Sequence, residues 1–296
     1  MGTLKFSTKK SLYGVLFIMP CMAVLMVMML YPLIQTFLFS FSTITLPRFS
    51  LRFNGLNNFI KVFSRPEVPT VIGNTVKWTL CSVIFRLILG MVTALVMNSE
   101  FPGVRFLRIV VLIPWTVPSI VSANSWRWIF QGDFGVINGM LKAWGFSPYP
   151  WIGNANTAMG AILAAATWAG YPFVMMMLLS AMQGLPRDYF EAAMVDGANA
   201  FQRFWHIIIP GIKPVLLIVL ALEAINAINA FDMIFTMTGG GPGNATEIFG
   251  LFIYRLGFGL FDFAGASAVS VALILAALIF CVIYVVLQNA GKRGGN

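Results

Sequence analysis

Charge is scarce in this sequence. Asp, Glu, Lys and Arg make up 10% of its 296 residues, and hydrophobic residues make up 59%. Soluble globular domains carry about 25% charged residues, so this chain has too few of them to cover the surface of a globular domain in water. His206 is the only histidine, and all three cysteines lie inside apolar runs, where a thiol behaves as a small buried hydrophobe. The composition predicts a chain that lives in lipid, with no metal site and no disulfide framework.

Motifs of catalytic sites are also absent. The glycine-rich stretch 238–244 has no Lys-Ser/Thr pair after it, so it lacks the cation and the magnesium ligand of a phosphate-binding loop. Neither Gly-x-Ser-x-Gly nor His-Glu-x-x-His occurs. We therefore expect a non-catalytic chain without a cofactor. If ATP drives its work, another polypeptide must bind the ATP and Mg²⁺ and hydrolyse the nucleotide.

Long apolar runs are what the sequence has in abundance. Each supplies the roughly 20 residues that a helix needs to cross about 30 Å of hydrocarbon, and a helix satisfies its own backbone hydrogen bonds in lipid. The sequence predicts an all-α membrane bundle of six spans, forming one domain over residues 1–296. The predicted spans cover residues 12–41, 71–97, 106–130, 158–182, 215–237 and 264–287.

The formal net charge is +9. The basic residues of the chain are scattered over the flanks of the apolar runs and form no stripe, so we expect no nucleic-acid partner. They are modestly more frequent in the segments that would be inside if both termini were cytoplasmic, which is the orientation that the positive-inside rule favours. The sequence therefore predicts a multi-pass membrane protein with both termini in the cytoplasm.

Two prolines four residues apart, Pro114 and Pro118, interrupt the third predicted span. Each removes a helix hydrogen bond and crowds the preceding turn, so a kink or break is expected. Such a break is tolerated where protein or a water-filled cavity satisfies the freed groups, which indicates a span that lines the interior. A simple packing kink is the alternative.

A polar island over residues 183–210 separates the fourth and fifth spans. Pro186 suits a first helical turn, so a short helix is expected from Pro186 to Val195. Gly197 is suited to end that helix in a left-handed conformation, and Asn199 is placed to cap a second one. Aromatic and apolar residues at positions 201, 204, 205 and 208 then share one face.

This island resembles the EAA loop of ABC importer permeases. The residues at the fixed offsets of that pattern are Glu191, Ala192, Ala193, Gly197, Ile207, Ile209 and Pro210. Only the leucine of the pattern is changed, to Ile209. The resemblance implies that the loop docks on a separate ATP-hydrolysing subunit, with Glu191, Ala192, Ala193 and Gly197 as coupling residues. From composition alone, a short amphipathic helix resting at the membrane interface is the alternative.

Further segments resemble the carbohydrate permeases of the maltose-transporter type. They are Trp126–Phe130 with Gly135, Asn138, Pro150 and Trp151, then Phe231–Asp232, Thr238–Pro242 and Gly265–Ala268. The chain looks like the six-span core of the first permease subunit and lacks the extra N-terminal spans and large outer insertion of some members. The resemblance implies a second homologous permease, two ABC ATPase subunits and an external solute-binding protein, with Trp128, Gly241 and Pro242 as candidate docking positions.

Polar residues inside the spans are candidates for a substrate pathway. Glu223, Asn226, Asn229 and Asp232 recur every three residues and would form a polar stripe facing protein or water. Amides and carboxylates of this kind suit sugar hydroxyls, and interhelical hydrogen bonding is the alternative. Arg86 lies mid-span, where a charge needs a partner. Pairing with Glu223 is the plain hypothesis, and contact with an anionic sugar is the sharper one.

These features predict a permease subunit that imports a carbohydrate by alternating access, driven by ATP hydrolysis elsewhere. An importer of a polyol or glycerol phosphodiester is the alternative within the class. A self-sufficient secondary transporter or channel is the alternative from another class, but two corresponding broken helices would be expected for inverted repeats, and only one is evident. The identity of the sugar cannot be read from this chain.

Overall fold

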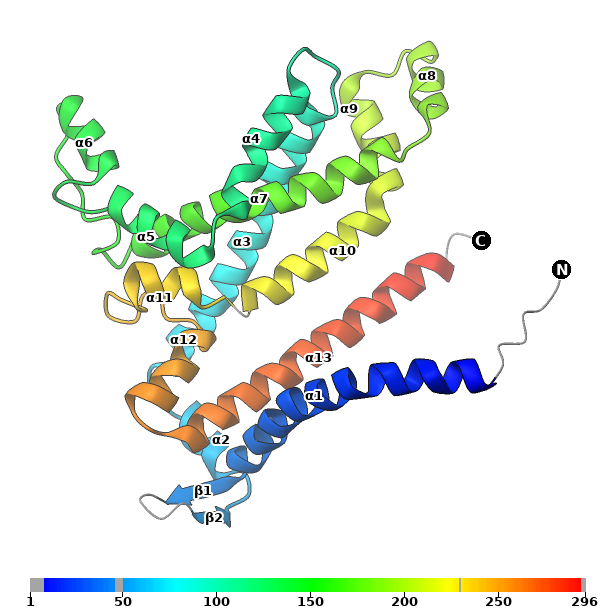
Figure 1. The fold of residues 1–296 in the computed structure, drawn as a ribbon. Coiled ribbons are helices and arrows are strands. Elements are labelled where there is room, and N and C mark those ends of the chain that lie inside the picture. Colours follow the sequence, from blue (N-terminus) through cyan, green and yellow to red (C-terminus); the bar gives the residue numbers. More distant parts are fainter. Residues whose placement is uncertain (1–7, 46–49, 229, 294–296) are drawn as a thin grey trace. The chain divides into compact units, whose positions relative to one another are not determined.

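A computed structural model describes residues 8–45, 50–228 and 230–293. These residues form helices joined by turns and loops, with one short β-hairpin (Figure 1). The all-α fold class is as predicted. Two compact units can be distinguished: Met1–Arg65 with Ile253–Leu278, and Pro66–Phe252 with Ile279–Asn296.

The first unit is built from both ends of the chain. Its elements are α1 (Thr8–Ser40), β1 (Ser42–Thr45), β2 (Ser50–Phe53), α2 (Asn57–Phe63), a π-helical turn η2 (Arg255–Gly259) and the first part of α13 (Phe263–Arg293). The two strands pair antiparallel, with Ser42 opposite Phe53 and Thr45 opposite Ser50. The hairpin and α2 lie between the first two predicted spans, where the sequence analysis predicted no helix or strand. Their residues show no long periodic pattern that would have revealed them.

Hydrogen bonds donated by one buried side-chain amide join α1, the hairpin and α2. The side-chain amide of Asn58 donates to the carbonyls of Ser40 and Ser42, both at 2.9 Å. Arg65 forms an ion pair with Asp262 at 2.9 Å, and Asp262 also accepts from the backbone N–H of Gly265 at 2.9 Å. These bonds fix the start of α13 against the end of α2.

The second unit carries most of the helices. They are α3 (Val68–Met97), α4 (Val104–Thr116), α5 (Ser119–Ile129), α6 (Val136–Ala143), α7 (Ala158–Gln183), α8 (Arg187–Val195), α9 (Ala200–Arg203), the π-helical turn η1 (Phe204–Ile208), α10 (Ile209–Ile228) and α11 (Asp232–Thr238). The short helix α12 (Phe249–Tyr254) and α13 lead from one unit to the other.

Close packing of α3 against α7 forms the centre of the second unit. Small buried residues on α7, among them Ala161, Ala165 and Ala166, let the two backbones approach, as is usual between membrane helices. Gly90 on α3 marks a close approach, because a Cβ atom there would lie 2.6 Å from the Val174 side chain.

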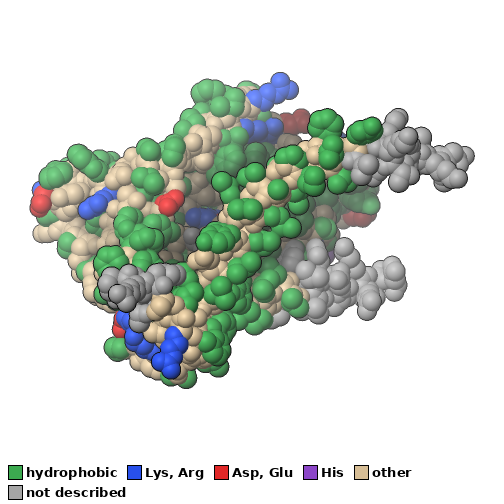
Figure 2. All heavy atoms as spheres, turned by 60° about the horizontal axis from the view of Figure 1, so that its bottom comes forward, with side chains coloured by type: hydrophobic (Ala, Val, Ile, Leu, Met, Phe, Trp, Pro, Cys, Tyr) green, Lys and Arg blue, Asp and Glu red, His purple; other side chains and the backbone are tan. Residues whose placement is uncertain are grey.

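Five described helices are long and apolar enough to cross a bilayer, and the pair α4–α5 supplies a sixth if it is one broken span. Figure 2 shows hydrophobic side chains over most of the surface in view. The predicted break falls at Pro118, where α4 and α5 are bent by 93°. Val117 is extended, as expected before a proline. Pro114 lies inside α4 and does not end it.

The fifth predicted span differs most from the structure. The apolar helix runs from Ala200 to Ile228, and a new helix begins at Asp232, whereas the prediction was one span over 215–237. A helix end leaves carbonyl groups without intrahelical partners, and the indole of Trp78 on α3 donates to one of them, that of Ala227. No proline or glycine lies at this helix end, so the apolar pattern alone predicts that the helix continues past it.

Candidate functional site

A cavity of about 740 Å³, lined by apolar and polar residues, lies within the second unit, among α3, α4–α5, α7 and α10–α11. Its lining residues include Arg86, Trp115–Ser119, Gly170, Phe173, Glu223, Asn226 and Asp232. The break between α4 and α5 forms part of this wall, because Thr116, Val117, Pro118 and Ser119 all line it. The interrupted span therefore faces the interior, as its prolines indicated.

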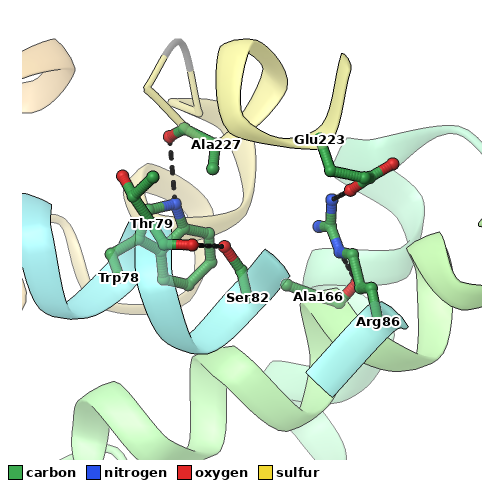
Figure 3. A network of polar contacts seen from close by, with 7 residues as sticks. All are labelled: Trp78, Thr79, Ser82, Arg86, Ala166, Glu223 and Ala227. Carbon is green, nitrogen blue, oxygen red and sulfur yellow. Dashed lines mark hydrogen bonds and ion pairs between the residues drawn. The ribbon is translucent and has the colours of Figure 1, made fainter. Parts of the chain in front are cut away.

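Arg86 and Glu223 meet at the edge of this cavity (Figure 3). A guanidinium nitrogen of Arg86 lies 2.8 Å from a carboxylate oxygen of Glu223, and the side chains are 16% and 5% exposed. The Nε–H of Arg86 donates to the carbonyl of Ala166 at 3.2 Å. The pair connects α3 to α10, and the carbonyl connects it to α7. The predicted pairing of these two charges is present.

Gly170 on α7 leaves room for the Arg86 side chain. A Cβ atom at position 170 would lie 2.5 Å from Nε and 2.7 Å from Cζ of Arg86, closer than such atoms approach. The arginine therefore lies flat against the glycine, which the sequence analysis did not single out. The run of small residues in the fourth span could have indicated close packing there, but not its partner.

The predicted polar stripe is divided between two helices. Glu223 is buried on α10, and Asn226 is exposed to the cavity two helical positions short of the helix end. Asp232 is exposed on the first turn of α11 and also lines the cavity. Asn229 lies outside the described residues. The structure thus brings Arg86, Glu223, Asn226 and Asp232 to one cavity, although not on one continuous helix.

An aromatic wall accompanies the polar groups. Trp115 on α4 and Phe173 on α7 stack with ring centroids 5.7 Å apart, and both line the cavity. Phe231 also lines it and stacks on Phe235 at 4.9 Å. The sequence analysis did not single out Trp115 or Phe173, because an aromatic residue in an apolar run carries no sign of which way it faces.

The three candidate docking positions lie near the end of α5 and in the turn after α11. Trp128, near the end of α5, is 70% exposed, and its ring meets Phe134 edge-on at 6.5 Å. The turn after α11 is held by Thr246, whose hydroxyl donates to the Gly241 carbonyl at 2.8 Å, and the Gly241–Pro242 peptide is cis. Arg127 donates to the carbonyl of Thr236 at 3.2 Å, which connects α5 to α11.

Asn138 organises the neighbouring loop. Its buried amide donates to the carbonyls of Gly132 and Tyr149, both at 2.8 Å. Its oxygen accepts from the backbone N–H of Tyr149 at 3.1 Å and the indole of Trp151 at 3.0 Å. A single side chain therefore closes the segment between α5 and α7.

The island between α7 and α10 forms two helices separated by a sharp turn. The first, α8, ends at Val195, and Gly197 follows with φ of 75°. The N–H of Ala198 donates to the carbonyl of Ala193, and that of Gly197 to Met194, which together make a Schellman motif. The predicted left-handed ending at Gly197 is therefore confirmed.

Asn199 caps the second helix as predicted. Its side chain accepts from the backbone N–H of Gln202 at 2.9 Å, and the Gln202 side chain accepts from the backbone N–H of Asn199 at 2.8 Å. This helix is not separate, however. It continues through the π-helical turn into α10, so that one helix connects the island to the cavity.

Glu191, Ala192 and Gly197 are exposed in the island, and Ala193 is partly buried. Ala193 and Gly197 line a shallow pocket of about 310 Å³ with Asp196, Gln202 and His206. The turn at Gly197 is exposed beside the large exposed side chains of Met194 and Val195.

The family model described as binding-protein-dependent transport system inner membrane component matches residues 86–293. The chain belongs to this family. It is thus a membrane subunit of a transporter, and the resemblance found in its motifs is confirmed.

The permease also resembles individual proteins over nearly its whole length. It is 36% identical to the trehalose/maltose transport system permease protein MalF of Thermococcus litoralis, covering 95% of both chains. A bacterial ABC transporter involved in the import of the acidic polysaccharide alginate contains a chain of the same fold, with a TM-score of 0.83, 19% identity, and coverage of 97% and 98%. The alginate transporter in complex with its alginate pentasaccharide-bound periplasmic protein gives a TM-score of 0.82 at 19% identity, covering 93% of both chains. The ABC importer permease fold predicted for this chain is confirmed.

Proposed function

We propose that this permease carries a carbohydrate, either a sugar or a sugar derivative, across the bacterial inner membrane by alternating access. The observation that carries the proposal is the cavity, which combines the amide of Asn226, the carboxylate of Asp232 and the aromatic face of Trp115. Amides and carboxylates donate to and accept from hydroxyls, and an aromatic face covers the apolar side of a pyranose ring. The similarity to a trehalose/maltose permease supports the same substrate class.

Partner subunits supply the energy in this proposal. Two ABC ATPases bind ATP and Mg²⁺, and this chain binds neither. They dock on the island, with Glu191 as a coupling residue. Ala192 and Ala193 allow close approach, and Gly197 sets the angle between α8 and α9. A second homologous permease completes the pathway across the membrane.

Substrate arrives from the outside on a solute-binding protein. Its docking surface includes Trp128, Gly241 and Pro242, since the exposed indole of Trp128 is a large amphipathic anchor of the kind that dominates protein interfaces. The island and both termini then lie in the cytoplasm. The alginate importer offers a precedent of the same fold, because it has been seen with a periplasmic protein bound.

Purification and transport test this proposal together. The tagged chain is purified gently from its native membranes, co-purifying polypeptides are identified by mass spectrometry, and the assembly is reconstituted in liposomes with its binding protein. Recovery of a second permease and an ATPase, with ATP-dependent uptake of labelled maltose, trehalose or another sugar of a defined panel, is the expected result. Transport by this chain alone, without ATP, would instead favour a channel or secondary transporter.

Variants then locate the pathway. Asn226→Ala is expected to lower sugar uptake while assembly persists, because this side chain is exposed to the cavity. Asn124→Ala is the matched control, since that exposed amide hydrogen-bonds only to its own helix at Ile120. Loss of assembly in Asn226→Ala would assign the residue to helix packing.

A further inference from the structure

The positive charge of Arg86 is already paired with groups of the protein itself. Its guanidinium lies 2.8 Å from the Glu223 carboxylate, and its Nε–H is taken by the Ala166 carbonyl (Figure 3). A carboxylate in a ligand would have to compete with Glu223, which comes from the same protein and needs no binding entropy to remain in place. The most obvious cation for an anionic sugar is therefore already neutralised.

Packing also limits how the arginine can turn. Its side chain lies across Gly170, with the position of a missing Cβ only 2.5 Å from Nε. Burial of Glu223 also opposes separation of the pair, because a carboxylate that is 5% exposed would be strongly disfavoured without its partner. The pair is thus held as a unit, and its net charge toward the cavity is zero.

The exposed charge of the cavity is negative. Among the described residues that line it, Arg86 is the one cation, whereas Glu223 and Asp232 are both carboxylates. Asp232 is the exposed member of the three. The wall contributed by this chain therefore carries one negative charge beyond the internal pair.

We infer that this cavity selects neutral carbohydrates over anionic ones such as uronates, sulfonates or phosphorylated sugars. The inference rests on the proposed function and makes it more specific. Asn226, Asp232 and Trp115 suit hydroxyls and a ring face, while the Asp232 carboxylate repels a ligand anion. The sugar-acid hypothesis for Arg86 is thereby replaced by a role in neutralising Glu223. The alginate importer, whose substrate is acidic, shares the fold at 19% identity and imposes no substrate on this chain.

Equilibrium binding to the purified transporter tests the inference. The complete assembly of permeases and ATPases is placed in lipid nanodiscs without the solute-binding protein, so that the binding protein's own selectivity does not enter. The probes are pairs of gluco-, galacto- and manno-configured mono- and disaccharides, each compared with its C6-oxidised uronate at one ionic strength. We expect at least one neutral member to bind about tenfold more tightly than its uronate partner, because a like charge is removed.

Two variants assign the discrimination to named carboxylates. Asp232→Asn is expected to narrow the difference in affinity between each neutral sugar and its uronate. The change removes the charge of an exposed side chain and leaves no buried group without its partner. Glu223→Gln frees the Arg86 charge and is expected to reverse the preference toward the uronate. Asp133→Asn is the matched control, because Asp133 is exposed on an outer loop and does not line the cavity.

The outcomes separate this inference from the function on which it rests. Equal or tighter binding of uronates by the wild-type transporter would overturn it while leaving carbohydrate import in place. Unchanged discrimination in a folded Asp232→Asn transporter would also count against it, whether or not Glu223→Gln can be purified. Failure of every sugar to bind would contradict the carbohydrate function itself.

Discussion

The indole N–H of Trp78 on α3 donates to the carbonyl oxygen of Ala227, 3.1 Å away, one residue before α10 ends. Trp78 is 1% exposed, so its donor and that acceptor have no access to water. One hydrogen bond between two helices thus fixes where the long helix stops and the cavity wall changes direction.

Trp78→Phe is expected to destabilise the permease, because it keeps most of the ring but removes the donor. The Ala227 carbonyl keeps the backbone N–H of Ala230 as a donor at 3.2 Å, so the variant loses one buried hydrogen bond, worth about 0.5–1.5 kcal/mol. Thermal unfolding of the detergent-solubilised protein, followed by size-exclusion chromatography, measures the change. Trp128→Phe provides the comparison, since that ring is exposed and its loss should leave the melting temperature unchanged. Equal melting temperatures for both variants would refute the importance of the Trp78 bond.

Gly170→Ala is expected to abolish or severely reduce uptake. The added methyl group would lie 2.5 Å from Arg86 Nε, so the guanidinium must move away from Glu223. Gly160→Ala tests the specificity of this effect, because position 160 is on the same helix and has no heavy atom within 4 Å of the added carbon. Uptake is measured in membrane vesicles at matched protein levels. Similar uptake in both variants would show that Arg86 does not depend on this glycine.

Arg86→Gln and Glu223→Gln should each destabilise the protein more than the double variant does. Removing one partner of a buried ion pair typically costs about 3–5 kcal/mol, because the other charge remains uncompensated. The double variant carries no charge at the site and should recover much of the loss. A double-mutant cycle on melting temperature measures this coupling, and additive effects of the two single changes would contradict a direct interaction.

Gly197→Glu is expected to eliminate uptake while the protein still reaches the membrane. Position 197 has φ of 75°, a conformation that costs a side chain roughly 1–2 kcal/mol, and the new acidic group would stand on the surface proposed to meet the ATPase. Gly103→Glu controls for the backbone cost, because Gly103, just before α4, has φ of 87° and equally open surroundings. Co-purification of the ATPase measures docking directly. Normal uptake by Gly197→Glu would show that the island does not couple ATP hydrolysis to transport.

Local chemistry made several features predictable. The turn at Gly197, the cap at Asn199 and the break at Pro118 depend on neighbouring residues, and all three are present. The Arg86–Glu223 pair was also predictable, because a charge inside an apolar run must find an opposite charge. Long apolar runs likewise indicated the helices and most of their bounds.

Features that depend on distant residues were not predictable. The end of α10 is stabilised from α3, and the fit of Arg86 depends on a missing Cβ atom on α7. Trp115 and Phe173 are separated by the whole outer segment that Asn138 organises, yet their rings stack. Periodicity describes one element at a time, so it cannot report which faces of different helices meet.

The uninterrupted helix from Ala200 to Ile228 gives the permease a mechanical property. At about 1.5 Å per residue, its 29 residues form a rod about 40 Å long. The Asn199 capping box holds one end, and Asn226 lies near the other. Under the proposed coupling, a displacement of the island would be transmitted along this one helix to the residues around the cavity. Its wider turn, Phe204–Ile208, and Pro214 are the places where such a helix bends first.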